Sequence, residues 1–232
     1  MNKHKNIIVL IIIIIFCSNR IATSSQNVYY GLTFDYNISL TIFNVLSFCC
    51  MSNFLRMGLS SVFSKNIIKL IKNNNRKTAL AFELVQKTKK MILFLLINFS
   101  SIYIFESLHN DINIYRFFVY CFLNILTSSL LMLIQFYFEL FISIDFGIYF
   151  INFIYISGIL SGQFLYWYSL SHSDILGTVA LYFNKINILN YLSINRIEAL
   201  NLDKITIIIF LSILIIGLLA LLNKKIVKKD IL

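Results

Sequence analysis

The chain has 232 residues, of which 59% are hydrophobic and 16% aromatic, with no proline and a formal net charge of +10 at pH 7. A soluble domain of this length cannot bury so much apolar surface, so the composition excludes a soluble protein and indicates a membrane protein. We expect no nucleic-acid partner, because most of the positive charge lies beside apolar runs, where anionic lipid headgroups attract it.

Six apolar stretches are predicted to be transmembrane helices. Each reaches or approaches the ~20 residues that a ~30 Å hydrocarbon core requires. Because the backbone in lipid must satisfy its own hydrogen bonds, runs of this length form helices. The sequence therefore predicts an all-α, polytopic membrane protein with a single transmembrane domain over residues 1–232. The predicted spans are about 7–22, 38–55, 91–108, 117–138, 146–170 and 205–222.

The basic residues are unevenly distributed about these spans. Fifteen of the 20 lysines and arginines lie in the N-terminal segment, in residues 56–90 and in the C-terminal segment. The other five are Arg20, Arg116, Lys185, Arg196 and Lys204. Since basic residues close to spans remain on the cytoplasmic side, this pattern predicts that both termini are cytoplasmic.

The first stretch allows two interpretations. It holds 11 consecutive apolar residues, Ile7 to Cys17, behind Lys3 and Lys5, which is also the arrangement of a secretory signal peptide. Residues 1–24 are therefore either a retained span or a cleaved signal, and we favour the retained span. The next segment lies outside the cell in both cases.

Residues 56–90 form the main cytoplasmic segment, with nine basic residues and one acidic residue, Glu83. An amphipathic piece before Asn73 is followed by a second one that continues into the third span. Such a broken helix suits the transmission of force from a partner protein. It also suits a helix that lies on anionic lipid at the membrane surface.

Small and polar residues lie within the fourth and fifth spans. Asn124, Ser128 and Gln135 recur at intervals of four and seven, which places them on one helix face. That face either lines a translocation route or forms hydrogen bonds between helices. In the fifth span, Gly158 and Gly162 are four residues apart and allow another helix to approach closely.

Two connections predict local geometry. The turn at residues 139–145 is short, so the helices on either side of it should be antiparallel neighbours. The external loop at residues 171–204 is neither charged enough to be a simple solvated loop nor apolar enough to span. We expect a pair of short amphipathic helices there, at or dipping into the outer interface.

No pattern in the sequence predicts catalysis. There is no Gly-rich nucleotide-binding loop, no spaced set of metal ligands and no nucleophile motif, and the four cysteines lie in apolar runs. Glu106, Glu139 and Asp145 are predicted at helix ends rather than at mid-membrane, where an ionisable residue would indicate an ion pathway. We therefore expect no catalytic residue, no cofactor, no metal site and no enzymatic activity.

The basic turn Ile71-Lys72-Asn73-Asn74-Asn75-Arg76-Lys77 separates spans two and three, and a long external loop separates spans five and six. Together with six spans and cytoplasmic termini, this layout resembles the ABC-2 type permease subunits. The small subunits of bacteriocin or lantibiotic immunity and export systems are the most similar. The resemblance covers the whole chain in layout, with local sequence similarity limited to Lys72–Lys90. In that family the loop between spans two and three contacts a separate ATPase, and the last external loop forms short re-entrant helices.

The resemblance implies a function and its residues. The chain would be the permease subunit of an ABC transporter that exports or expels a peptide or another amphipathic substrate. It would pair with a separate ABC ATPase and with itself or a second permease. The implied coupling residues are Asn75, Arg76, Lys77, Glu83 and Lys87.

The alternative is a stand-alone membrane immunity or accessory protein that acts without ATP. Both readings place the chain in the cell membrane. Heavy use of Ile, Asn, Lys, Phe and Tyr, typical of AT-rich codons, indicates a low-GC bacterium, and the resemblance implies a Gram-positive one. The substrate, its direction of movement and the choice between a homodimer and a heterodimer stay open.

Overall fold

The computed structural model describes residues 31–35, 38–62, 76–109, 111–172 and 174–228. Within these ranges the protein is helical and contains no strand. The long helices are α2 (Ile38–Val62), α4 (Arg76–His109), α5 (Ile114–Phe141), α6 (Ile144–Ser171) and α9 (Lys204–Lys228). The short elements are α7 (Ile175–Ile186), the 3-10 helix η3 (Ile188–Leu192) and α8 (Ile194–Ala199). The predicted span at 7–22 lies outside the described residues.

Within the described residues, five helices are long and apolar enough to cross a membrane, so the protein is a multi-pass membrane protein. Their apolar windows are Ile38–Leu55, Ala81–Leu108, Ile114–Phe141, Ile144–Ser171 and Lys204–Lys224. These windows contain or closely overlap the five predicted spans from residue 38 onward. The third predicted span is shorter than the helix that contains it, because the amphipathic segment before Met91 continues the same helix back to Arg76.

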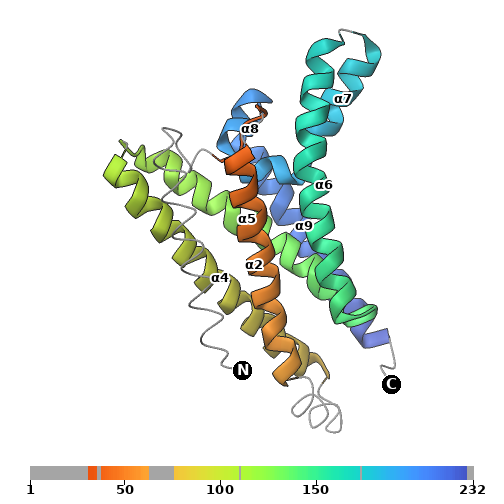
Figure 1. The fold of residues 1–232 in the computed structure, drawn as a ribbon. Helices are drawn as coiled ribbons and strands as arrows, with labels where there is room; N and C mark the ends of the chain where they lie inside the picture. Colours follow the sequence, from red (N-terminus) through yellow and green to blue (C-terminus); the bar gives the residue numbers. More distant parts are fainter. Residues whose placement is uncertain (1–30, 36–37, 63–75, 110, 173, 229–232) are drawn as a thin grey trace.

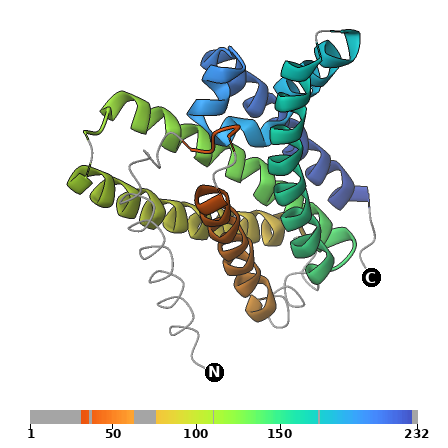
Figure 2. The ribbon, with the colours of Figure 1, turned by 45° about the horizontal axis from the view of Figure 1, so that its top comes forward.

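Helix α5 is the centre of the bundle. It packs against α4, α6, α9 and η3, and half of its membrane window is buried. In contrast, 17% of the α9 window is buried, so α9 lies at the edge and turns most of its surface outward. Helix α2 packs against α4 and α6, on the other side of the bundle from α9 (Figures 1 and 2).

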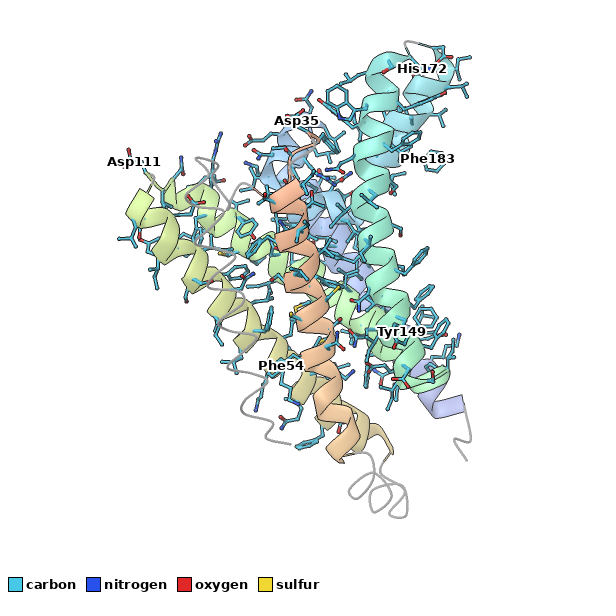
Figure 3. All side chains as sticks on the ribbon, viewed as in Figure 1. Asp35, Phe54, Asp111, Tyr149, His172 and Phe183 are labelled. Atoms are coloured by element: carbon cyan, nitrogen blue, oxygen red, sulfur yellow. The ribbon has the colours of Figure 1, made fainter. Side chains whose placement is uncertain are left out.

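The long helices run alternately up and down, so their termini gather at two ends of the bundle (Figure 1). We call the end that holds the start of α4, with Lys89, and the end of α9, with Lys224, the basic end. The opposite end, which holds α7, η3 and α8, is the loop end. Figure 3 places Asp35, Asp111 and His172 at the loop end.

The turn between α5 and α6 is short, as the sequence predicts. Helix α5 ends at Phe141 and α6 begins at Ile144. The Ser143 hydroxyl accepts the backbone N–H of Phe146 at 3.2 Å and caps the new helix. The two helices pack extensively against each other, so the prediction of antiparallel neighbours is confirmed.

The segment after α6 forms three short elements rather than the expected pair. Helix α7 folds back along α6, and buries its small face, Gly177, Ala180 and Asn184, on the inner side. Its large apolar side chains are exposed, and Phe183 points away from the bundle (Figure 3). An outward apolar face of this kind suits contact with lipid. After α7, η3 packs against both α5 and α6.

Candidate functional site

Two of the predicted coupling residues lie inside the bundle. Glu83 and Lys87, one turn apart on α4, are 3% and 2% exposed. The Lys87 ammonium forms an ion pair with the Glu139 carboxylate of α5, and it lies 4.8 Å from the centre of the Phe136 ring. Both favourable contacts offset the cost of removing the ammonium from water.

Glu139 is also tied to α2 through an amide. The Gln135 Nε2 atom donates to Glu139 Oε1 at 2.8 Å and to the backbone carbonyl of Ser52 at 3.2 Å. Ser52 in turn donates its hydroxyl to Asn152 of α6 at 2.9 Å. We call Glu83, Lys87, Gln135 and Glu139 the Lys87 cluster. Its bonds connect three spans near the basic end, and the Ser52 hydroxyl extends the connection to α6.

Glu83 gives this cluster a second carboxylate. Its Oε1 atom is buried and has no hydrogen-bond partner among the described residues. Glu83 stands four residues before Lys87, a spacing that brings the two side chains together on one helix face. Two buried carboxylates therefore lie near the Lys87 ammonium, which forms its ion pair with Glu139 on α5.

The other coupling candidates lie at the start of α4. Arg76 and Lys77 are its first two residues, and Asn75 falls outside the described residues. Burial assigns Glu83 and Lys87 to the packing of α4 against α5, so neither side chain offers a surface to another subunit. Sequence reasoning placed Glu139 correctly near a helix end but missed its burial. The four-residue spacing of Glu83 and Lys87, and of Gln135 and Glu139, was the available signal.

The predicted polar face on α5 divides into two sites. Gln135 belongs to the Lys87 cluster. Asn124 and Ser128 instead line a partly open cavity of about 30 Å³, with both polar and apolar walls, among α2, α4, α5, α6 and η3. The Asn124 amide donates to the backbone carbonyls of Tyr120 at 2.9 Å and Leu192 at 3.3 Å, so it joins α5 to η3.

Several polar side chains from different spans converge on this cavity: Asn44, Ser47, Asn98, Tyr120, Asn124, Ser128 and Tyr155. The Asn98 Oδ1 atom is buried and has no hydrogen-bond partner in the described part of the chain. A water molecule needs about 10–15 Å³ and two or more polar partners, so the cavity suits one or two waters. An amide oxygen without a partner is costly inside a membrane bundle, and such a water would satisfy it.

Gly158 and Gly162 lie against the segment after α7. A Cβ atom at Gly158 would lie 2.4 Å from the Leu189 side chain, and one at Gly162 would lie 2.7 Å from Asn190 Oδ1. The element that approaches these glycines is therefore η3 rather than another span. Their lack of side chains lets the external segment sit directly on α6.

A second buried cation lies beside Gly162. Arg196 of α8 is 0% exposed. Its guanidinium donates to Asn190 Oδ1 at 3.0 Å and to the backbone carbonyls of Ile159 and Thr33 at 3.4 Å, and lies 4.9 Å from the centre of the Phe34 ring. Burial lowers the pKa of Arg196 to about 10, which leaves it charged at neutral pH.

We call Thr33, Ile159, Asn190 and Arg196 the Arg196 cluster. It fastens residues 31–35, α6, η3 and α8 to one another at the loop end. Ser193 strengthens the same connection, because its hydroxyl donates to the backbone carbonyl of Leu32. Sequence reasoning counted Arg196 only as one of five basic residues on the external side, and no local motif distinguished it.

Among the described residues, no group of three or more His, Cys, Asp or Glu side chains is placed to hold a metal ion. Cys49 and Cys121 are free thiols. Comparison with protein-family models, with curated proteins and with solved structures finds no match.

Proposed function

We propose that this protein is the membrane-spanning subunit of a transporter whose energy comes from a separate ATPase, as in the ABC-2 type permeases that its layout resembles. The substrate would be a peptide or another amphipathic molecule, exported or expelled across the cell membrane. The subunit would pair with a copy of itself or with a similar subunit, and it would not hydrolyse ATP.

One observation carries this proposal: α4 is an unbroken helix of 34 residues from Arg76 to His109. At 1.5 Å per residue it is ~50 Å long, well beyond the ~30 Å of a hydrocarbon core. The extra length lies at the basic end, where force from a cytoplasmic partner would arrive. A continuous helix passes a displacement at its first turn into the membrane without a hinge.

The Lys87 cluster gives that displacement a route into the bundle. Its ion pair joins α4 to α5, and the Gln135 amide joins α5 to α2. Helix α5 also bonds to η3 through Asn124, close to the cavity that Asn124 lines. A movement of α4 driven by two closing ATPases would therefore reach both the cavity and the external segment. The three short elements of that segment also agree with the external helices of the family.

The experiment is purification of the tagged full chain in mild detergent from the organism that makes it, with mass spectrometry of the bound proteins. We expect a stoichiometric partner that carries a nucleotide-binding Gly-rich loop. The double charge reversal Arg76→Glu/Lys77→Glu should abolish the association. The matched control Lys228→Glu/Lys229→Glu changes the net charge equally in the C-terminal segment and should preserve it.

Two results would overturn the proposal in different ways. Association that survives the reversal at Arg76 and Lys77 would remove the contact from the start of α4. A chain that purifies alone and functions without any ATPase would instead support the stand-alone immunity or accessory protein.

A further inference from the structure

An apolar groove of about 290 Å³ lies between α5 and α9. Its lining comes from Ile134, Tyr137 and Phe138 of α5 and from Leu218 and Leu221 of α9. These side chains present carbon almost throughout, apart from the Tyr137 hydroxyl. The groove is therefore unsuited to a polar or charged ligand, because desolvation without compensating hydrogen bonds is costly.

The groove lies at the lipid-facing edge of the bundle. Leu221 is half exposed, and α9 as a whole buries little of its surface. Beside the groove, a Cβ atom added to Gly217 would meet nothing within 4 Å. In a membrane this surface faces hydrocarbon. The groove is apolar and large enough to hold a stretch of one acyl chain.

Charge at the end of α9 identifies the class of lipid. Lys224 is exposed and stands three residues beyond Leu221, on the same side of the helix. Lys225 and Lys228 follow, and α9 contains no acidic residue from Lys204 to Lys228. Leu218 and Lys224 are six residues apart, or ~9 Å along the helix axis. A chain seated at Leu218 and Leu221 would bring its headgroup to Lys224.

We propose that the groove between α5 and α9 binds one acyl chain of an anionic phospholipid, whose phosphate is held by Lys224. This site is independent of the proposed transport, since it requires only that the chain lie in a membrane. The bound lipid fills the gap between the central helix and the edge helix at the basic end. It therefore stabilises the docking of α9 on α5.

The test is native mass spectrometry of the purified full chain in mild detergent, titrated with phosphatidylglycerol or phosphatidylcholine. We expect one phosphatidylglycerol to be retained in preference to phosphatidylcholine. Lys224→Gln should weaken phosphatidylglycerol binding about fivefold, the equivalent of ~1 kcal/mol for one lysine near an anionic surface. Leu221→Trp, which fills the groove, should weaken the binding of that lipid at least as much.

Two matched controls separate this site from diffuse attraction. Lys89→Gln removes an exposed charge at the same end, and Ile213→Trp adds the same bulk to an exposed position of α9 outside the groove lining. Both should bind phosphatidylglycerol like the parent chain. Equal losses in Lys89→Gln and Lys224→Gln would overturn the proposal, and so would unchanged binding in Leu221→Trp.

A thermal measurement keeps the test decisive if a variant is poorly folded. A ligand that binds the folded state raises the melting temperature. Phosphatidylglycerol should raise that of the parent chain and of Ile213→Trp, but not that of Leu221→Trp or of a second filling variant, Leu218→Phe. A similar rise in a folded groove-filling variant would contradict the assignment.

Discussion

The Lys87 cluster and the Arg196 cluster each bury a cation almost completely, but they balance its charge by different means. At the basic end, the Lys87 ammonium meets the Glu139 carboxylate of another span. At the loop end, the Arg196 guanidinium is held by two backbone carbonyls and the Asn190 amide oxygen, over the face of an aromatic ring.

This difference in charge compensation indicates how the helices at each end of the bundle are held together. A one-to-one ion pair depends on both partners, since loss of either leaves an uncompensated charge in a low-dielectric site. A guanidinium shared among neutral acceptors spreads the compensation over several elements. The first arrangement links two long spans, and the second fixes short segments whose apolar side chains, such as Leu189 and Ile197, are also buried.

The largest effect should come from breaking the ion pair. Lys87→Met leaves two carboxylates, Glu83 and Glu139, buried without their cation, and should cost about 3–5 kcal/mol of unfolding free energy. Denaturant unfolding in detergent micelles measures this cost. Lys89→Met, at an exposed position two residues away, is the control and should change stability little. The double variant Lys87→Met/Glu139→Leu should regain part of the loss, since only Glu83 then stays buried without the cation, and no recovery would contradict a specific pair.

A smaller effect should follow from Arg196→Met. The change leaves the carbonyl of Thr33 and the Asn190 amide oxygen without their donor, at about 1–3 kcal/mol in total. The loss should be local, so limited proteolysis near residues 31–35 should accelerate more than global unfolding. Arg196→Lys should retain only part of the stability that Arg196→Met loses, because an ammonium cannot reach the same set of acceptors. Uniform loosening of the whole chain would argue against a local fastening.

Substitutions at two glycines compare a position in close contact at the loop end, Gly162, with an open position on α9, Gly217. Gly162→Ala places a Cβ atom 2.7 Å from Asn190 Oδ1 and 3.0 Å from Arg196 Nη1, and should cost about 1–2 kcal/mol by overpacking. Gly217→Ala meets open space and should be neutral or stabilise α9 by about 0.5–1 kcal/mol, because glycine disfavours the helix. Melting temperatures of the two variants in one detergent test the difference. Equal losses would mean that η3 does not sit on α6 at Gly162.

The smallest effect concerns the start of α9. The Asp203 carboxylate accepts the backbone N–H of Thr206 at 3.0 Å and its hydroxyl at 2.8 Å, and these hydrogen bonds lower the pKa of Asp203. Since the folded pKa lies below the unfolded one, this stabilisation is present above the ordinary pKa of aspartate. It is lost as the pH falls through the lowered value.

Asp203→Ala should therefore lower the melting temperature slightly at pH 7, through loss of the helix cap. The difference from the parent chain should shrink as the pH falls toward 3. A melting series over that range measures both chains side by side. A difference that grows with acid would contradict the assigned cap.

The sequence by itself determined where the membrane helices lie, at least from residue 38 onward. In lipid, the backbone of an apolar run such as 38–55 can satisfy its hydrogen bonds only as a helix. Length and composition were therefore sufficient to predict these spans. The short turn at residues 139–145 likewise dictated that α5 and α6 run side by side. The same reasoning anticipated short helices after Ser171, although it did not anticipate that η3 would rest on Gly158 and Gly162.

Only the tertiary structure decided which polar groups meet. Periodicity placed Asn124, Ser128 and Gln135 on one face, but could not show that the first two line a cavity while Gln135 bonds to Glu139 and to α2. Lys87 finds its partner on another span, and Arg196 finds carbonyls far away in the chain. A helical repeat specifies the direction in which a side chain points, whereas the identity of its partner depends on how separate helices pack.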